Sequence, residues 1–179
     1  MIYLIGGPPR VGKSTLARML LDRDRIPGCS TDTLVSMLQN AAPHHGVRHG
    51  THSDKAELAQ PFLIEFLRAV ADGIGEEPEP SECYVVEGDI VTPAAAAAAA
   101  GFGLPVAAVF LGNTTLTVDD LRIAPHWLEG ADEATYCRTA AWITERSAVV
   151  RDACVTTGQV YIEMGGGHTE GLERAYAAL

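Results

Sequence analysis

Short apolar runs recur along the chain, and most of them end at a glycine or an acidic residue. Runs of this kind are typical of buried strands in a parallel sheet. They predict five strands, of which the second is the weakest: residues 2–5, 28–32, 83–86, 106–111 and 160–163. No run reaches the roughly 18 apolar residues that a membrane span needs, so we expect no membrane partner.

The stretches between these runs carry apolar positions at helical spacing. They predict helices over residues 14–22, 33–40, 55–72, 93–101, 133–157 and 170–178. Pro61 predicts a break or kink in the third helix, and the fifth helix is long enough for one break. Thr92 is predicted to cap the alanine-rich fourth helix, and Gly101 to end it. Residues 43–53 and 114–132 are predicted to be a loop and a polar connection.

Strands that alternate with helices are typical of an α/β fold, in which a mainly parallel sheet is covered by helices on both faces. A length of 179 residues fits one domain, and we expect residues 1–179 to form it.

The formal charge is −10, from 13 basic and 23 acidic residues. This charge argues against a general polyanion binder, so we expect no nucleic-acid partner, although a local positive site for a small phosphorylated ligand remains open. The four cysteines are widely spaced and form no CxxC pair, which indicates reduced thiols in a cytoplasmic protein. The first residues have no basic flank, so we expect no signal peptide.

The strongest motif follows the first predicted strand and opens the first predicted helix. The residues Gly7-Pro8-Pro9-Arg10-Val11-Gly12-Lys13-Ser14 match G-x-x-x-x-G-K-[ST] at every fixed position. The glycines permit close backbone approach, and successive N–H groups and the helix N-terminus surround a phosphate. We expect Lys13 to contact the β- and γ-phosphates and Ser14 to ligate Mg²⁺, with Thr15 as the next hydroxyl in reach.

With this motif the chain resembles the P-loop small-molecule kinases, a group that includes shikimate, gluconate and nucleoside-monophosphate kinases and zeta-toxin-like kinases. The segments STDTL, VVEGD and DACVTTGQVYIEMGG extend the resemblance over most of the chain. It implies a five-stranded parallel sheet of order 2-3-1-4-5, an ATP site at the carboxyl ends of the strands and a helical lid over roughly residues 113–146. Asn113 is followed by two threonines rather than by the Lys-x-Asp of a guanine motif, which argues against a signalling GTPase.

Three acidic residues follow predicted strands and are candidates for chemistry at the edge of the sheet. Asp32 orients or deprotonates the acceptor hydroxyl in this interpretation, or contributes to metal binding; alternatively it is the N-cap of the helix that begins at Thr33. Glu87 is the better candidate for the Mg²⁺ shell and Asp89 for the acceptor, and the alternative is a polar strand end without a ligand.

Arginines on the long fifth helix are candidates for phosphate contacts. Arg138 and Arg146 lie about two turns apart and are expected to face roughly the same side. Arg122 and Arg151 are alternatives, and all four could instead form surface pairs with Glu133, Glu145 or Asp152. Arg10 either stacks on the nucleotide or faces solvent. The glycines at 165–167 either wrap the base or form a plain turn.

These residues favour an ATP- and Mg²⁺-dependent phosphotransferase acting on a hydroxyl or phosphate of a small-molecule acceptor. Its catalytic residues would be Lys13, Asp32, Arg138 and Arg146. The alternative is a nucleotide-binding regulatory protein with little or no turnover. The histidines at 44, 45, 49 and 52 have no carboxylate or cysteine at ligand spacing, which argues against a metal site there.

Overall fold

The computed structural model describes residues 1–47, 52–74, 79, 82–123 and 125–179. Its centre is a five-stranded sheet in the order β2-β3-β1-β4-β5, and every pair of neighbouring strands is parallel. The strands are β1 (Ile2–Gly6), β2 (Gly28–Ser30), β3 (Tyr84–Glu87), β4 (Val106–Gly112) and β5 (Val160–Glu163). The predicted fold class and strand order are confirmed.

The register of the three central strands brings their carboxyl ends together. Ile5 of β1 is opposite Glu87 of β3, and Gly6 is opposite Phe110 of β4. The segment that leaves β1 therefore begins beside the acidic end of β3. This is the crevice at the carboxyl edge where open α/β sheets bind their ligands.

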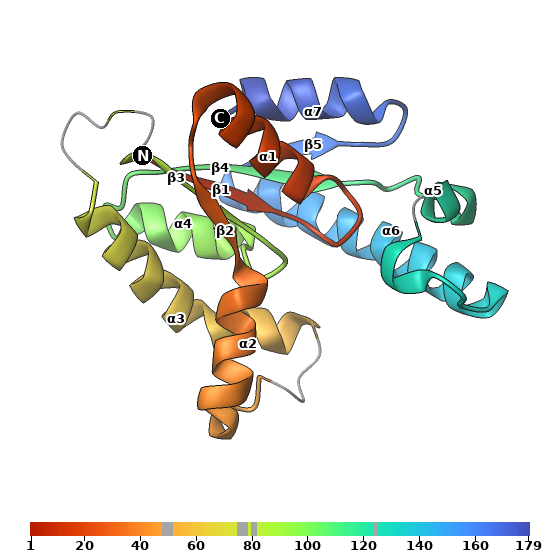
Figure 1. The fold of residues 1–179 in the computed structure, drawn as a ribbon, viewed down its shortest axis with the longest axis horizontal. Coiled ribbons are helices and arrows are strands. Elements are labelled where there is room, and N and C mark those ends of the chain that lie inside the picture. Colours follow the sequence, from red (N-terminus) through yellow and green to blue (C-terminus); the bar gives the residue numbers. More distant parts are fainter. Residues whose placement is uncertain (48–51, 75–78, 80–81, 124) are drawn as a thin grey trace.

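Helices cover both faces of the sheet (Figure 1). On one face lie α1 (Lys13–Asp24) and α7 (His168–Ala177), which pack on each other. On the other face lie α3 (His52–Asp72), α4 (Pro93–Gly101) and α6 (Glu133–Thr157). The remaining helices lie beyond the carboxyl edge: α2 (Thr31–Ala41), η1 (Pro43–His45), α5 (Val118–Ile123) and η3 (His126–Leu128).

Two hydrophobic clusters, one on each face, hold these layers together. Ile2, Leu4 and Phe110 pack with α3 and α4, whereas Ile5 and Leu111 pack with α1 and α7. The helix α6 joins both clusters, because its first half contributes Ile143 to one and its second half contributes Val150 and Cys154 to the other. All four cysteines are free.

Several sequence predictions about helices are wrong. Of the break or kink predicted at Pro61, the break does not occur: Pro61 lies on the exposed side of α3, and the apolar face continues through Ala59 and Leu63, both fully buried. The helix α6 is unbroken over 25 residues, and the expected polar connection contains α5 and η3. Thr92 caps α4 as predicted, but Gly101 is its last helical residue and not the left-handed residue that ends it.

The part of the chain that the structure describes contains no helix with the length and apolar character needed to cross a bilayer. Of the four clustered histidines, His44 and His45 stack on each other, with ring centroids 4.2 Å apart. His49 and the side chain of His52 lie outside the described residues.

Candidate functional site

The loop between β1 and α1 has the backbone geometry of an anion-binding turn. Gly7 and Gly12 have φ values of 129° and 99°, and a Cβ at Gly7 would lie 2.0 Å from the carbonyl oxygen of Leu111. Gly12 is the N-cap of α1, and the first turn of α1 has no acidic residue and no side-chain cap. The N–H groups of this turn are therefore available to an anion, together with the positive end of the helix dipole.

Lys13 lies inside this loop and contacts an acid from another strand. Its side chain is only 8% exposed, and its Nζ donates to the carbonyl oxygen of Pro8 at 2.8 Å and to Oδ1 of Asp89 at 2.6 Å. The ion pair joins residues that are 76 positions apart in the sequence. The ammonium group is thus held at the mouth of the anion-binding turn by the residue that follows β3.

Ser14 makes the second link between the loop and β3. Its hydroxyl donates to Oε1 of Glu87 at 3.1 Å, and Glu87 is 8% exposed. Burial raises the pKa of Glu87, and Lys13 and the Ser14 hydroxyl act against this rise. A hydroxyl oxygen and a carboxylate oxygen side by side are hard ligands of the type that Mg²⁺ prefers. The donor set therefore fits a bound Mg²⁺ ion.

A hollow of about 570 Å³ opens above the loop, and most residues predicted to bind nucleotide or metal line it. They are Pro9, Arg10, Gly12, Lys13, Ser14, Thr15, Asp32, Glu87 and Asp89. We call it the phosphate hollow. Gly7 and Pro8 instead line an adjoining hollow, and Val11 turns its side chain into the core, where it is 1% exposed.

Asp32 lies in the first turn of α2 and lines the phosphate hollow. The suggestion that Asp32 is the N-cap of α2 is wrong. The helix begins at Thr31, and the cap is Ser30, whose side chain accepts from the backbone N–H of Asp32 at 3.3 Å. Because the helix starts earlier than predicted, the Asp32 carboxylate is not used for capping and is available to the hollow.

The two arginines predicted on α6 lie in different surroundings. Arg146 is half-buried and lines the hollow that adjoins Gly7 and Asp89. Arg138 is exposed, donates to Oγ1 of Thr135 at 2.9 Å and lines none of the hollows found among the described residues. Two helical turns separate them by about 12 Å along the axis, so one reaches the loop while the other lies farther out.

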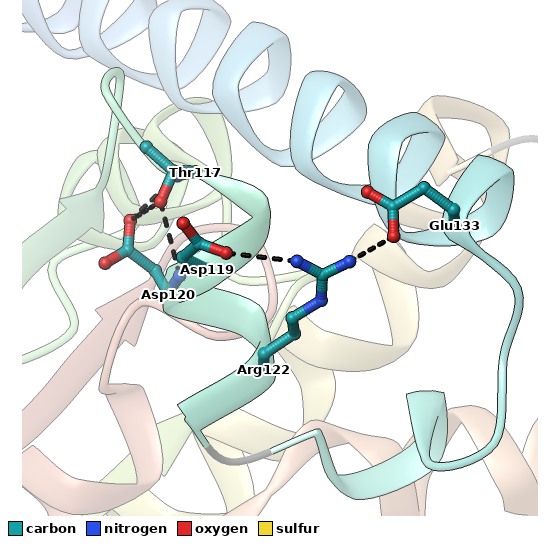
Figure 2. A network of polar contacts seen from close by, with 5 residues as sticks. All are labelled: Thr117, Asp119, Asp120, Arg122 and Glu133. Carbon is teal, nitrogen blue, oxygen red and sulfur yellow. Dashed lines mark hydrogen bonds and ion pairs between the residues drawn. The ribbon is translucent and has the colours of Figure 1, made fainter.

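Arg122 and Arg151, the alternative phosphate ligands, contact carboxylates. Arg122 bridges Asp119 of α5 and Glu133 at the start of α6 (Figure 2). Its guanidinium also lies 5.6 Å from the ring centroid of Tyr136. Arg151 pairs with Asp152 at 3.2 Å. These contacts agree with the surface-pairing interpretation of both residues.

The same network closes the N-terminus of α5. Thr117 donates from its N–H and its hydroxyl to Oδ2 of Asp120, at 2.8 and 2.6 Å, and the N–H of Asp120 donates back to the Thr117 hydroxyl. These hydrogen bonds lower the pKa of Asp120. The segment before α6 therefore has local order of its own.

Arg10 has a strained and partly desolvated environment. Its φ is 70°, which is uncommon for a residue with a Cβ, and burial lowers the pKa of its guanidinium. Among the described residues, its buried Nε has no hydrogen-bond partner. The guanidinium is thus neither fully solvated nor paired, and it lines the phosphate hollow.

Three side chains at the rim of the phosphate hollow were missed by the sequence analysis: His126, Trp127 and His168. Trp127 belongs to η3 and is 62% exposed, which is unusual for a large aromatic ring. His168 begins α7 and lies so close to Gly12 that a Cβ there would be 2.9 Å from its ring. Only the tertiary fold brings these segments to the loop; exposed aromatic and histidine residues after a strand were the one available signal.

The glycines at 165–167 follow β5 beside a hydrogen-bonded carboxylate. Glu163 accepts from the N–H groups of Thr114 and Gly165, both at 3.0 Å, and from the hydroxyls of Thr114 and Tyr161. Burial would raise the pKa of Glu163, but these hydrogen bonds outweigh it and lower the pKa. Glu163 therefore fixes the start of the 113–146 segment to the end of the sheet.

The structure is similar to several solved kinases at low sequence identity. A gluconokinase from Sinorhizobium meliloti 1021 superposes with a TM-score of 0.53 and 16% identity, covering 99% of this chain and 89% of that one. A shikimate kinase from Bacteroides thetaiotaomicron gives 0.55 and 17%, covering 97% and 94%. A sugar kinase from Janibacter sp. HTCC2649 gives 0.53 and 15%, covering 99% and 92%.

No protein-family model and no curated protein sequence matches the chain. The likeness to solved structures therefore concerns the fold. With its sheet order, its Lys13 loop at the carboxyl edge and these structural neighbours, the chain has the fold of the P-loop small-molecule kinases.

Proposed function

We propose that the protein is an ATP- and Mg²⁺-dependent phosphotransferase that moves the γ-phosphate to a hydroxyl or phosphate of a small-molecule acceptor. The observation that carries the proposal is the pair of contacts between the glycine loop and β3, Lys13 with Asp89 and Ser14 with Glu87, in one hollow. They bring together an anion-binding turn, a cation, a pair of hard oxygen ligands and two further carboxylates. Phosphoryl transfer needs this set of groups, because most of its catalysis is positioning and charge stabilisation.

In this proposal, the β- and γ-phosphates of ATP occupy the turn from Gly7 to Ser14. Phosphate oxygens then compete with Asp89 for Lys13, and the ammonium exchanges one anionic partner for another. Mg²⁺, held by the Ser14 hydroxyl and through Glu87 or Asp32, would neutralise charge on the transferring group. Asp89, released from Lys13, and Asp32 remain to orient the acceptor and accept its proton.

Closure of the 113–146 segment over the nucleotide completes the proposal. Trp127 and His126 line the rim of the phosphate hollow from this segment, and Arg146 lines the hollow next to it. Closure would exclude water and bring a further cation to the γ-phosphate, with Arg138 as the second candidate.

We also expect a reducing compartment, the cytoplasm, because all four cysteines are free.

The test is transfer of labelled γ-phosphate from ATP to a panel of alcohols, sugars, nucleotides and antibiotics in the presence of Mg²⁺. We expect transfer by the wild type, and a loss of about a hundred- to a thousandfold in Lys13→Ala, since one preorganised donor at a developing anion is worth that much. Arg23→Ala is the matched control, because that cation is exposed and pairs with Glu173 far from the loop. Circular dichroism and thermal unfolding check that each variant folds.

Two results would contradict the proposal. The first is transfer retained by a folded Lys13→Ala protein. The second is tight binding of a nucleoside triphosphate, measured by calorimetry, without transfer to any acceptor and without any effect of Asp32→Asn. The second result would instead favour a nucleotide-binding regulatory protein.

A further inference from the structure

Two smaller hollows meet the phosphate hollow at Asp89. The first has a volume of about 260 Å³ and lies between α3, the start of α4 and the second half of α6. The second, of about 180 Å³, lies between the start of α2, α3 and the residue that follows Asp89. Asp89 lines all three, and Asp32 lines the phosphate hollow and the second small one. A molecule in the small hollows would thus reach the same carboxylates that face the phosphates.

The wall of the first small hollow is mainly apolar. It is formed by Ala56, Val91, Pro93, Val149, Val150 and Ala153. Val149 remains 50% exposed, although it lies next to a concave surface. Pockets of this kind bind molecules with an apolar body and leave orientation to a few polar groups. A small, fully hydrated sugar would leave this wall uncovered.

The charged groups around the two small hollows favour a cation over an anion. The described residues that line them carry the carboxylates of Asp32, Glu57 and Asp89, against the cations of Lys55 and Arg146. In the proposed function, Arg146 turns to the γ-phosphate, which leaves Lys55 alone against the three acids. A carboxylate or phosphate on the acceptor would face this excess of negative charge.

A buried hydroxyl in the second small hollow lacks a partner. Thr31 is 2% exposed, and its Oγ1 makes no hydrogen bond with any described residue. An unsatisfied buried hydroxyl costs free energy, so such a group needs an explanation. The hydroxyl is enclosed and faces Gly88, where a Cβ would lie 1.9 Å from Oγ1, so Thr31 shapes the wall of this hollow without offering a polar group to a ligand.

We infer that the acceptor is a neutral or cationic alcohol with an apolar body, such as an aromatic diol or amino alcohol. This inference rests on the proposed function. The apolar body lies against Val149, an amino group faces Glu57, and the reacting hydroxyl lies at Asp89 and Asp32. Its oxygen forms a bond to the γ-phosphorus while the β–γ bridging bond breaks. ADP leaves with that electron pair, and the hydroxyl proton passes to a carboxylate and then to water.

Three probes of the same size and shape test the class of acceptor: 1-phenyl-1,2-ethanediol, 2-amino-1-phenylethanol and mandelate. They are neutral, cationic and anionic, and share a phenyl ring and a benzylic hydroxyl. With labelled ATP and Mg²⁺, we expect kcat/KM for the diol and the amino alcohol to exceed that for mandelate at least tenfold. Glu57→Gln should lower the ratio of kcat/KM for the amino alcohol to kcat/KM for the diol, because only the amino alcohol carries a charge that faces this carboxylate.

The apolar wall has its own pair of variants on α6. Val149→Asp should lower kcat/KM for the diol at least tenfold and leave ATP affinity unchanged in calorimetry. Val155→Asp is the matched control, because Val155 lies on the same helix, is 82% exposed and lines none of the hollows among the described residues. Both positions are at least half exposed, so both variants are expected to fold.

Three outcomes overturn the inference while the proposed function stands. The first is faster transfer to mandelate than to the diol or the amino alcohol, and the second is an equal effect of Val149→Asp and Val155→Asp on transfer. The third is a protein that phosphorylates other acceptors but none of these three probes. A protein that binds no nucleoside triphosphate fails the proposed function itself, and calorimetry with ATP and Mg²⁺ reveals this before any acceptor is added.

Discussion

Charged side chains make polar contacts both at the loop on the carboxyl edge of the sheet and within the 113–146 segment. The two sets of contacts differ in sequence separation and in exposure. At the loop, Lys13 with Asp89 and Ser14 with Glu87 join residues 76 and 73 positions apart, and both Lys13 and Glu87 are 8% exposed. In the 113–146 segment, the ion pairs of Arg122 with Asp119 and Glu133 span 3 and 11 positions (Figure 2), and the Arg122 side chain is 47% exposed.

This difference indicates that the loop is the more rigid of the two regions. Each of these contacts joins a buried residue to one distant in the sequence and forms only when β1 and β3 are in register, so the loop is held in one geometry. Exposed contacts between near neighbours contribute little and form in many arrangements of the surrounding chain. A preorganised phosphate site and a segment able to close over it require this combination.

The largest expected effect comes from adding one methyl group at a positive-φ glycine in each of the two regions. Gly7→Ala places a Cβ 2.0 Å from the backbone oxygen of Leu111 at a φ of 129°, whereas Gly130→Ala, at a φ of 78°, meets nothing within 4 Å. Gly130→Ala should cost about 1 kcal/mol, the ordinary price of a left-handed alanine. Gly7→Ala should cost at least about 3 kcal/mol, because a backbone atom must move.

Urea unfolding monitored by circular dichroism measures both changes in the free energy of unfolding. Gly46→Ala, with a φ of 74° and no described atom within 4 Å of its Cβ position, is a second control outside either region. Equal losses in the free energy of unfolding for Gly7→Ala and Gly130→Ala would mean that the loop is no more rigid than the 113–146 segment.

The next effect concerns the carboxylates that face each region's cation. Asp89→Asn removes the anion that competes with phosphate for Lys13, so nucleotide affinity should rise, while transfer should fall on the order of a hundredfold because the acceptor loses a proton-accepting group. Asp119→Asn, at the carboxylate paired with Arg122, should change neither quantity. Calorimetry with a non-hydrolysable ATP analogue and the labelled-phosphate assay separate the two effects. Weaker nucleotide binding by a folded Asp89→Asn protein would contradict this role.

The sheet and the loop could be predicted from the sequence because their signals are local. Four of the five strands are short apolar runs, β2 being the exception, and the glycine pattern before Lys13 requires its own backbone geometry. The helix boundaries were less predictable. A cap at Ser30 rather than Asp32 shifts the start of α2, and burial of one apolar face carries α3 through Pro61.

The contents of the candidate site depend on tertiary packing, which no local pattern encodes. Arg138 and Arg146 share a helix, yet only Arg146 lines a hollow next to the loop. Trp127 follows β4 and His168 follows β5 in the chain, and only the tertiary fold brings both to the hollow beside Gly12. The sequence supplies the residue types, whereas the packing of the helices on the sheet decides which of them meet.

Glu163 lies at the boundary between the two regions and gives a pH-dependent effect of intermediate size. Because its hydrogen bonds with Thr114, Gly165 and Tyr161 lower its pKa below the ordinary value of 4.5, its ionised form stabilises the folded protein above that value. This stabilisation is lost as the pH falls through the lowered pKa. The stability difference between wild type and Glu163→Gln should therefore be largest near neutral pH and shrink toward pH 3.

Urea unfolding at several pH values measures this difference, and Glu129→Gln is the control. Glu129 is exposed, and its carboxylate makes no hydrogen bond or ion pair within the described ranges. A difference between wild type and Glu163→Gln that grew as the pH fell would show that Glu163 does not tie the start of the 113–146 segment to the sheet in its ionised form.

The smallest effect on stability and on transfer is expected at Arg122, which lies in the exposed network of the 113–146 segment. Arg122→Gln removes two exposed ion pairs and the contact with the Tyr136 ring, so the thermal midpoint should fall less than in Gly130→Ala, and part of the fall should vanish in high salt. Arg68→Gln, at an exposed arginine paired with Glu65, calibrates the loss of such a pair. Transfer should stay within about twofold of the wild type, because a pair this exposed contributes little to any one arrangement of the segment. A loss of transfer as large as that of Asp89→Asn would instead mean that Arg122 leaves its carboxylates for the γ-phosphate on closure. Arg122 would then belong to the phosphate site and not only to the segment that covers it.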